Sequence, residues 1–175
     1  MRIIAGRWRG HRLRPLKGKG VRPTTDRVRE AWMSAMGGNL PGLSVLDLFA
    51  GSGALGLETL SRGASRVVFV EQSRSSLRTL EANIEHLGAS REVTVVTDDV
   101  FKYVGSLAPH AFDVALADPP YSTGDAERLV ELYRKKPFAN ALWLEHPWRE
   151  ELPLPDGTRT RRYGDTALST LTPES

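Results

Sequence analysis

Residues 44–56 read Ser-Val-Leu-Asp-Leu-Phe-Ala-Gly-Ser-Gly-Ala-Leu-Gly, and this stretch decides the fold class of the 175-residue chain. Its first half is a short apolar run, typical of a strand that is buried on both faces. Its second half carries Gly51, Gly53 and Gly56, which satisfy the pattern Gly-x-Gly-x-x-Gly. A glycine-rich turn between a strand and a helix lets backbone amides approach a nucleotide closely. The stretch therefore predicts the first strand–loop–helix unit of a nucleotide-binding α/β fold.

Strand-like and helix-like segments alternate along the rest of the chain. The first candidate strand, residues 44–49, is followed by further apolar candidates at residues 66–71, 93–97, 112–118 and 141–146. Amphipathic helical patterns separate them, and the tail offers a closing antiparallel pair, Arg159–Tyr163 with Thr166–Leu171. Because strands and helices alternate, we expect a doubly wound α/β fold with a mostly parallel sheet.

The first thirty residues are strongly basic. They hold ten Lys and Arg against two acids, whereas the whole chain holds 24 against 21. Residues 2–14 mix basic with apolar side chains around two glycines, which predicts a small β-hairpin arm. We therefore divide the chain into a basic N-terminal arm, residues 1–22, and a catalytic domain, residues 23–175.

This charge asymmetry indicates a polyanionic partner for the arm, although a solvated basic tail would have the same composition. Trp8 could stack on a base, and it could equally serve as a packing anchor. The candidate RNA-binding residues of the arm are Arg7, Trp8, Arg9 and Arg12.

Composition excludes several other classes of protein. The chain has no cysteine, which excludes a disulfide scaffold, a thiolate metal site and cysteine nucleophile chemistry. No apolar run approaches the roughly 18–20 residues of a membrane span, and the N-terminus lacks the apolar region of a secretory signal. The four histidines share no metal-ligand spacing. We expect a cytoplasmic protein without a metal and without a membrane partner.

Acidic residues near the strand ends indicate which nucleotide the glycine loop holds. Glu71 ends the second candidate strand, where such an acid accepts ribose hydroxyls, and this arrangement fits NAD as well as S-adenosylmethionine. Asp47 favours S-adenosylmethionine, because a carboxylate beside the loop repels a pyrophosphate but attracts a sulfonium and an ammonium group. After the third strand, Asp99 and the backbone amide of Val100 are candidate adenine contacts, although an acid there also suits a helix N-cap.

Asp118-Pro119-Pro120-Tyr121 ends the fourth candidate strand, at the edge where open α/β sheets bind ligands. An exocyclic base amine is a poor nucleophile, because its lone pair is delocalised into the ring. Asp118 and the carbonyl of Pro119 can each accept one N–H and so direct the lone pair at a methyl carbon, while the two prolines keep the loop rigid. Tyr121 offers an aromatic face for an unstacked base. These four residues are the catalytic candidates, and a simple turn is the alternative.

Four motifs in this order resemble those of the RsmD family. They are Arg-Ile-Ile-x-Gly-x-Trp-Arg-Gly at residues 2–10, Arg-Pro-Thr-Thr-Asp-Arg-Val-Arg-Glu at 22–30, Asp-Leu-Phe-Ala-Gly-Ser-Gly at 47–53 and Asp-Pro-Pro-Tyr at 118–121. The last motif is shared with DNA adenine and protein glutamine methyltransferases, whereas the first two single out this family. The similarity extends over residues 2–150.

The resemblance implies a Rossmann-like, S-adenosylmethionine-dependent methyltransferase that modifies N2 of one guanine in bacterial 16S rRNA, within the small ribosomal subunit or its assembly intermediate. We expect it to act as a monomer. The resemblance implies cofactor contacts at Asp47, Phe49, Gly51, Gly53, Glu71, Asp99 and Val100, and it places Arg22, Thr24, Arg27 and Arg29 against RNA or over the methyl donor. Two alternatives stay open: a DNA adenine N6-methyltransferase, and a non-catalytic RNA-binding or assembly factor.

Overall fold

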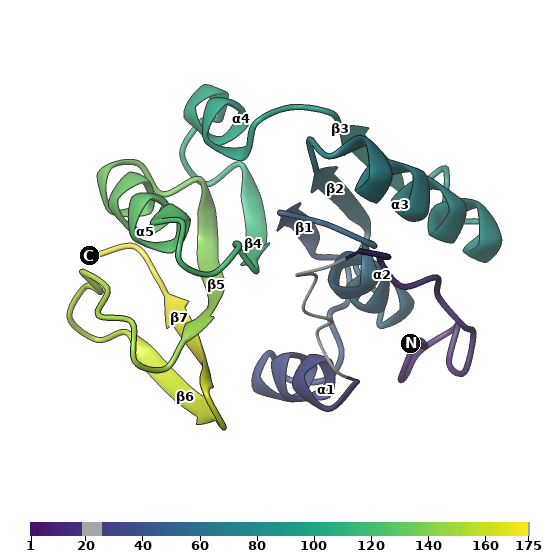
Figure 1. The fold of residues 1–175 in the computed structure, drawn as a ribbon, viewed down its shortest axis with the longest axis horizontal. Coiled ribbons are helices and arrows are strands. Elements are labelled where there is room, and N and C mark those ends of the chain that lie inside the picture. Colours follow the sequence, from purple (N-terminus) through teal and green to yellow (C-terminus); the bar gives the residue numbers. More distant parts are fainter. Residues whose placement is uncertain (19–25, 175) are drawn as a thin grey trace.

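The computed structural model describes residues 1–18 and 26–174, and within them one seven-stranded sheet forms the centre of the fold (Figure 1). The strands are β1 Ser44–Leu48, β2 Arg66–Val70, β3 Val93–Val96, β4 Phe112–Ala117, β5 Ala139–Pro147, β6 Arg159–Tyr163 and β7 Thr166–Leu171. Their spatial order is β3-β2-β1-β4-β5-β7-β6. The first five are parallel, and β7 runs antiparallel to both β5 and β6. The predicted mostly parallel sheet and its closing antiparallel pair are confirmed.

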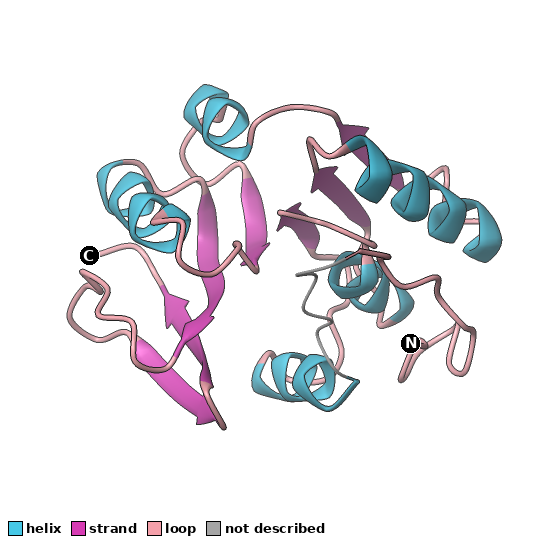
Figure 2. Ribbon diagram, viewed as in Figure 1, coloured by secondary structure: helices cyan, strands magenta, loops and turns pink. Residues whose placement is uncertain are grey.

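Helices cover both faces of this sheet (Figure 2). They are α1 Asp26–Ala35, α2 Ala54–Ser61, α3 Arg74–Leu87, α4 Val100–Ser106 and α5 Asp125–Lys135. The first three pack in one hydrophobic cluster and the last two in another, on the opposite face. The predicted stop at Gly88 is confirmed, since this residue caps α3 with a φ of 65°. Within the described ranges, no helix is long and apolar enough to cross a membrane.

The strand order places a ligand crevice between β1 and β4. From β1 the chain proceeds outward through β2 to β3, and then returns to the other side of β1 to form β4. The loops that leave β1 and β4 therefore diverge to opposite faces, and open α/β sheets bind ligands at this switch point. The glycine loop follows β1 and the Asp-Pro-Pro-Tyr motif follows β4, so both predicted motifs lie at that point.

The N-terminal arm turns back on itself without forming two regular strands. One antiparallel bridge joins Arg2 to Arg12 in place of the longer ladder of a regular hairpin. The arm is also anchored in the core, because Ile3 and Leu13 are buried in the same cluster as α1, α2 and α3. The proposed division of the chain at residue 22 falls outside the described residues.

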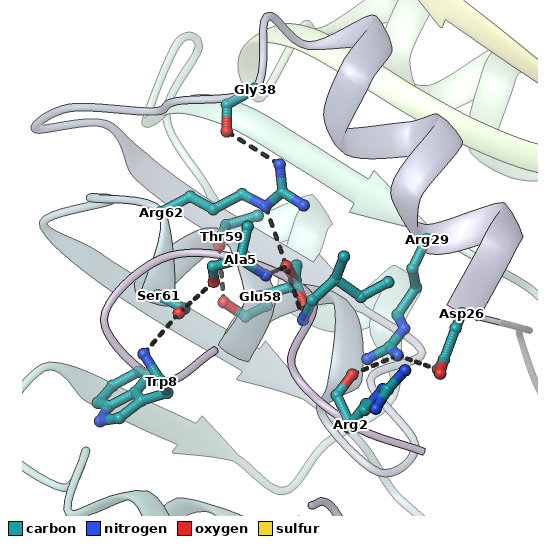
Figure 3. Close-up of polar contacts among 12 residues, drawn as sticks. Arg2, Ala5, Trp8, Asp26, Arg29, Gly38, Glu58, Thr59, Ser61 and Arg62 are labelled. Carbon is teal, nitrogen blue, oxygen red and sulfur yellow. Dashed lines mark hydrogen bonds and ion pairs between the residues drawn. The ribbon is translucent and has the colours of Figure 1, made fainter. Parts of the chain in front are cut away.

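Helix α2 holds the arm through hydrogen bonds to the backbone of the arm (Figure 3). The buried carboxylate of Glu58 accepts from the backbone N–H groups of Ile4 and Ala5, at 2.9 and 3.1 Å, and from the side chain of Arg62. Ser61 accepts from the N–H of Trp8 and donates to the carbonyl of Ala5. The arm is therefore bound to the helix that begins at the glycine loop.

Glu58→Gln should loosen this attachment. The amide nitrogen cannot accept a hydrogen bond, so at least one buried donor loses its partner, at a cost of about 1–3 kcal/mol. We expect a lower midpoint of thermal unfolding and faster hydrogen exchange at Ile4 and Ala5. Glu92→Gln is the matched control, because it removes the exposed Arg7–Glu92 ion pair of the same arm, worth about 0–1 kcal/mol. Equal effects of the two substitutions would show that Glu58 does not anchor the arm.

Candidate active site

Four carboxylates lie near the carboxyl ends of neighbouring strands. Asp47 belongs to β1 and Glu145 to β5, whereas Glu71 and Asp118 directly follow β2 and β4. Alternate residues of a strand share a face, and the residues two positions earlier (Val45, Phe69, Leu116 and Trp143) all pack in the cluster formed by α1, α2 and α3. The four carboxylates therefore share one face of the sheet, in the order Glu71, Asp47, Asp118, Glu145.

Asp47 is the most deeply buried of these acids, with 2% of its surface exposed. Burial raises its pKa well above the ordinary aspartate value, and the negative charges of Asp118 and Glu71 raise it further. A hydrogen bond of 2.9 Å from the N–H of Gly56 to Oδ2 opposes this shift but does not cancel it. Leu48 lies opposite Ala117 in the pairing of β1 with β4, so the glycine loop and the Asp-Pro-Pro-Tyr motif leave the sheet side by side.

Close packing makes two glycines of the loop necessary. A Cβ on Gly56 would lie 2.4 Å from Cε1 of Phe69 and 2.9 Å from the Asp47 carboxylate. A Cβ on Gly53 would lie 2.3 Å from a methyl carbon of Leu80, and the φ of Gly53 is +81°. Phe49, just before the loop, also has a positive φ of 56°, which is a strained conformation for an aromatic residue. Because these glycines lack a side chain, the backbone of this segment can pack close against β2 and α3.

Glu71 fastens the glycine loop to the end of β2. Its Oε2 accepts from the N–H of Gly51 at 2.8 Å, and its Oε1 accepts from the N–H groups of Gln72 and Ser73. Each carboxylate oxygen has two lone pairs, so these three bonds leave one acceptor site, on Oε2, for a predicted ribose hydroxyl. The ribose contact itself stays a prediction.

The charge of the site fits a cationic ligand. The charges of Asp118 and Glu71 raise the pKa of Asp47, and no ion pair among residues 1–18 and 26–174 includes Asp47. A sulfonium or ammonium group would offset the cost of ionising this buried carboxylate, whereas a pyrophosphate would add to it. The residues present therefore fit S-adenosylmethionine better than a dinucleotide.

Asp99, in the loop after β3, caps the N-terminus of a helix, which is one of the two roles that the sequence left open. Asp99 is the N-cap of α4, and its Oδ1 accepts from the N–H of Lys102 at 2.9 Å. Val100 is the first residue of that helix and is buried. The N-cap reading of Asp99 is confirmed, and the adenine contacts of Asp99 and Val100 stay predictions.

The loop after β4 is held by its own hydrogen bonds and by the tail of the chain. Pro119 is buried and Pro120 exposed, and the carbonyl of Pro120 accepts from the hydroxyl of Thr123. The hydroxyl of Tyr121 lies 2.9 Å from Oγ1 of Thr166, the first residue of β7. This contact orients the half-buried tyrosine at the edge of the site.

The predicted RNA-binding residues of the arm differ in their surroundings. Arg9 and Arg12 are exposed. The guanidinium of Arg7 pairs with Glu92 at 2.7 Å and lies 3.9 Å from the ring centroid of Trp8. Trp8 is half-buried against the core, which supports its role as a packing anchor.

The second predicted group of RNA contacts needs a correction at Arg29. Its side chain is fully buried, and its Nη2 donates to the carbonyl of Arg2 at 2.6 Å and to the carboxylate of Asp26 (Figure 3). It therefore joins α1 to the arm and presents no charge to a polyanion. Arg27 is exposed, as an RNA contact requires. The predictions for Arg22 and Thr24 lie outside the described residues.

Two residues of the site were missed by the sequence reasoning. Glu145 is 3% exposed, and its Oε2 accepts from Nε1 of Trp32 on α1 at 3.2 Å. Its position near the end of the fifth predicted strand was the available signal, since the other three acids share that feature. Thr166 gave no local signal, because its contact with Tyr121 joins residues 45 positions apart.

Comparison with known proteins now decides the family. The family model described as "Conserved hypothetical protein 95" matches residues 1–171. The chain belongs to this family.

Relatives in the Conserved hypothetical protein 95 family resemble the chain along most of its length. The YlbH protein of Bacillus subtilis is 33% identical, with 97% of each chain covered. Ribosomal RNA small subunit methyltransferase D of Haemophilus influenzae is 40% identical over 75% of this chain and 69% of its own length. The solved structure of the yhhF protein of Escherichia coli superposes with a TM-score of 0.83 at 30% identity and covers 100% of this chain and 98% of its own. The resemblance to the RsmD family and the Rossmann-like fold are confirmed.

Asp47→Asn should raise the thermal stability of the ligand-free protein and weaken its binding of the cofactor. Because the folded-state pKa of Asp47 is raised, ionising it destabilises the ligand-free protein as pH rises above about 4. The asparagine variant has no such cost, and its side-chain oxygen can still accept from Gly56. We expect a higher midpoint of thermal unfolding at neutral pH and roughly ten- to hundredfold weaker binding of S-adenosylmethionine.

Calorimetry across pH provides the second measurement on Asp47. In the native protein a bound cation favours the carboxylate, so affinity should rise with pH until Asp47 is fully ionised, and the variant should lack this rise. A variant that is less stable than the native protein and binds the cofactor equally well would contradict both expectations.

Proposed function

We propose that this chain is an S-adenosylmethionine-dependent methyltransferase that modifies the exocyclic N2 of one guanine in 16S rRNA of the small ribosomal subunit. The observation that carries this proposal is the pairing of β1 with β4, in which Leu48 lies opposite Ala117, so that the glycine loop and the Asp-Pro-Pro-Tyr motif leave neighbouring strands at one edge of the sheet. The family relatives support it, because the Haemophilus influenzae protein is named a ribosomal RNA small subunit methyltransferase.

The cofactor site is formed by residues at the ends of β1, β2 and β3. S-adenosylmethionine, when bound, supplies a methyl group on a positively charged sulfur. Asp47 offsets that positive charge, the backbone of Gly51 and Gly53 allows close approach, and Glu71 accepts from the ribose hydroxyls. Phe49, Asp99 and Val100 complete the set of proposed contacts.

The Asp-Pro-Pro-Tyr segment after β4, here called the catalytic loop, orients the base amine for attack on the methyl group. The Asp118 carboxylate accepts one N–H of the base amine, and the Pro119 carbonyl accepts the other, so that the lone pair of nitrogen points toward the cofactor. Asp118 would also stabilise the positive charge that develops on nitrogen as the methyl group leaves the sulfur of the donor as a neutral thioether, and its carboxylate can accept the proton that the methylated amine then loses. Tyr121, held by Thr166, provides a stacking surface for the base. The buried Pro119 and the exposed Pro120 restrict the loop and keep these acceptors in place.

Glu145 supports guanine over adenine as the target. Ala117 and Leu144 are register partners in neighbouring parallel strands, so Asp118 and Glu145, which follow them, are neighbours on the same face. Guanine carries a ring N1–H beside its exocyclic amine, whereas adenine has an acceptor at N1. A second carboxylate beside Asp118 can accept the guanine N1–H and would repel the adenine acceptor.

The substrate reaches this site as part of a larger RNA. Arg9, Arg12 and Arg27 are exposed and provide positive charge for phosphates. The attachment of the arm to α2 fixes Arg9 and Arg12 relative to the glycine loop. We propose that the protein acts as a cytoplasmic monomer on the assembled subunit or a late assembly intermediate.

Asp118→Ala should abolish methylation while donor binding stays within a few fold. Undermethylated small subunits and radiolabelled S-adenosylmethionine provide the assay, with the modified nucleotide mapped by reverse transcription. We expect a loss of roughly a hundredfold or more, as for removal of a group that stabilises transition-state charge. Glu127→Ala, an exposed carboxylate on α5, is the matched control. Comparable turnover in the two variants would refute the role of Asp118, and no transfer by the native protein would refute the proposed function.

Glu145→Gln should weaken discrimination at the guanine N1 position. RNA with 2-aminopurine at the target keeps the amine but lacks the N1–H, so the native enzyme should prefer guanine over 2-aminopurine by roughly tenfold or more in kcat/KM. The variant should lose most of this preference and keep its donor affinity. Trp32→Phe, which keeps the carboxylate but removes its hydrogen bond, is the control. Equal loss of preference in both variants would mean that Glu145 acts only through the packing of α1.

A further inference from the structure

Trp148 stands apart from the other large apolar side chains. Among the described residues it is the one large hydrophobic residue that is exposed to solvent, with 41% of its surface accessible. It directly follows β5, and the guanidinium carbon of Arg162 lies 5.0 Å from its ring centroid. An exposed indole beside a guanidinium offers a surface on which an unpaired base can stack.

The strand beside Trp148 is basic and open to solvent. β6 is the last strand of the sheet and reads Arg-Thr-Arg-Arg-Tyr, with its first four residues exposed. Arg161 and Arg162 occupy successive positions of the strand and therefore point to opposite faces. The turn that follows contributes one acid, Asp165. Positive charge thus lies on both sides of this edge.

Hydrogen bonds connect this strand to the candidate active site. The turn between β6 and β7 holds Trp148 in place, since the N–H of Trp148 donates to the carbonyl of Asp165 at 2.8 Å. The next residue, Thr166, contacts the hydroxyl of Tyr121 at 2.9 Å. Trp148 and the end of β6 therefore lie at the same edge of the sheet as the catalytic loop, and on the β5 side of it (Figure 1).

We propose that Trp148, Arg161 and Arg162, here called the tail surface, bind the single-stranded RNA that flanks the target base. Trp148 stacks on a neighbouring base, and the two arginines contact phosphates on either side of it. The N-terminal arm attaches to α2, beyond β1, whereas the tail surface lies beyond β5. This inference rests on the proposed function.

Edge protection is the competing explanation for the arginines. Charged residues on an outer strand prevent sheets of different molecules from pairing. That role requires neither an exposed tryptophan nor a stacked guanidinium. It also does not require that the strand be tied to a catalytic loop.

Binding of a short unstructured RNA oligonucleotide over a range of salt concentrations separates the two explanations. Arg161→Gln with Arg162→Gln should flatten the slope of log affinity against log salt by about 0.7 for each phosphate that the protein no longer neutralises. Trp148→Ala should weaken binding roughly tenfold with little change in slope, and Trp148→Phe should restore most of it. Lys135→Gln, an exposed charge on α5, is the control and should leave the slope nearly unchanged.

The same variants are then tested for methylation of small subunits, where the inference predicts a raised KM with kcat retained. If native protein methylates subunits but the arginine variant keeps the full salt slope, the tail surface does not bind RNA. Self-association of that variant with an unchanged slope would establish edge protection instead. A raised KM with unchanged oligonucleotide affinity would assign the surface to a ribosomal protein and overturn the inference. If the native protein methylates no subunits, the proposed function fails.

Discussion

The buried carboxylate of Asp47 constrains both the packing of α2 against β1 and the charge of the ligand that the site can accept. Its ionisation is opposed by burial and by two neighbouring acids, and the Gly56 N–H offers only partial compensation. That hydrogen bond requires the backbone of α2 to approach β1 closely, which excludes any side chain at Gly56. Ionisation of Asp47 is thus unfavourable until a cation binds. We see here a local loss of stability that serves binding.

Helix α2 joins the two functional parts of the molecule. Its first turn begins at the glycine loop, and its last turn holds the arm through Glu58 and Ser61. Buried hydrogen bonds of this kind resist displacement, because breaking them leaves buried donors without partners. Arg29 attaches α1 to the arm as well. The basic residues of the arm are therefore presented from a fixed position relative to the cofactor site.

The order of the strands arranges the chemistry across the sheet. Glu71 and Asp47 lie on the side of β2 and β1, and Asp118 and Glu145 lie on the side of β4 and β5. The first pair suits a cationic methyl donor, and the second suits the N–H groups of a guanine. Beyond β5, the tail surface continues in the same direction. One face of the sheet thus carries the carboxylates proposed to face the donor and the amine, and the tail surface lies beyond them at the same edge of the sheet.

Local patterns in the sequence determined the strands, the glycine loop, the stop at Gly88 and three of the four carboxylates, because alternation, turn chemistry and strand ends are encoded by adjacent residues. Only the tertiary structure decided that Arg29 is buried, that the arm bonds to α2, and that Glu145 joins the site. The contact of Trp32 with Glu145 spans 113 positions, and that of Ile4 with Glu58 spans 54. Partners so distant leave no periodic signal, since their meeting depends on how the sheet and helices pack.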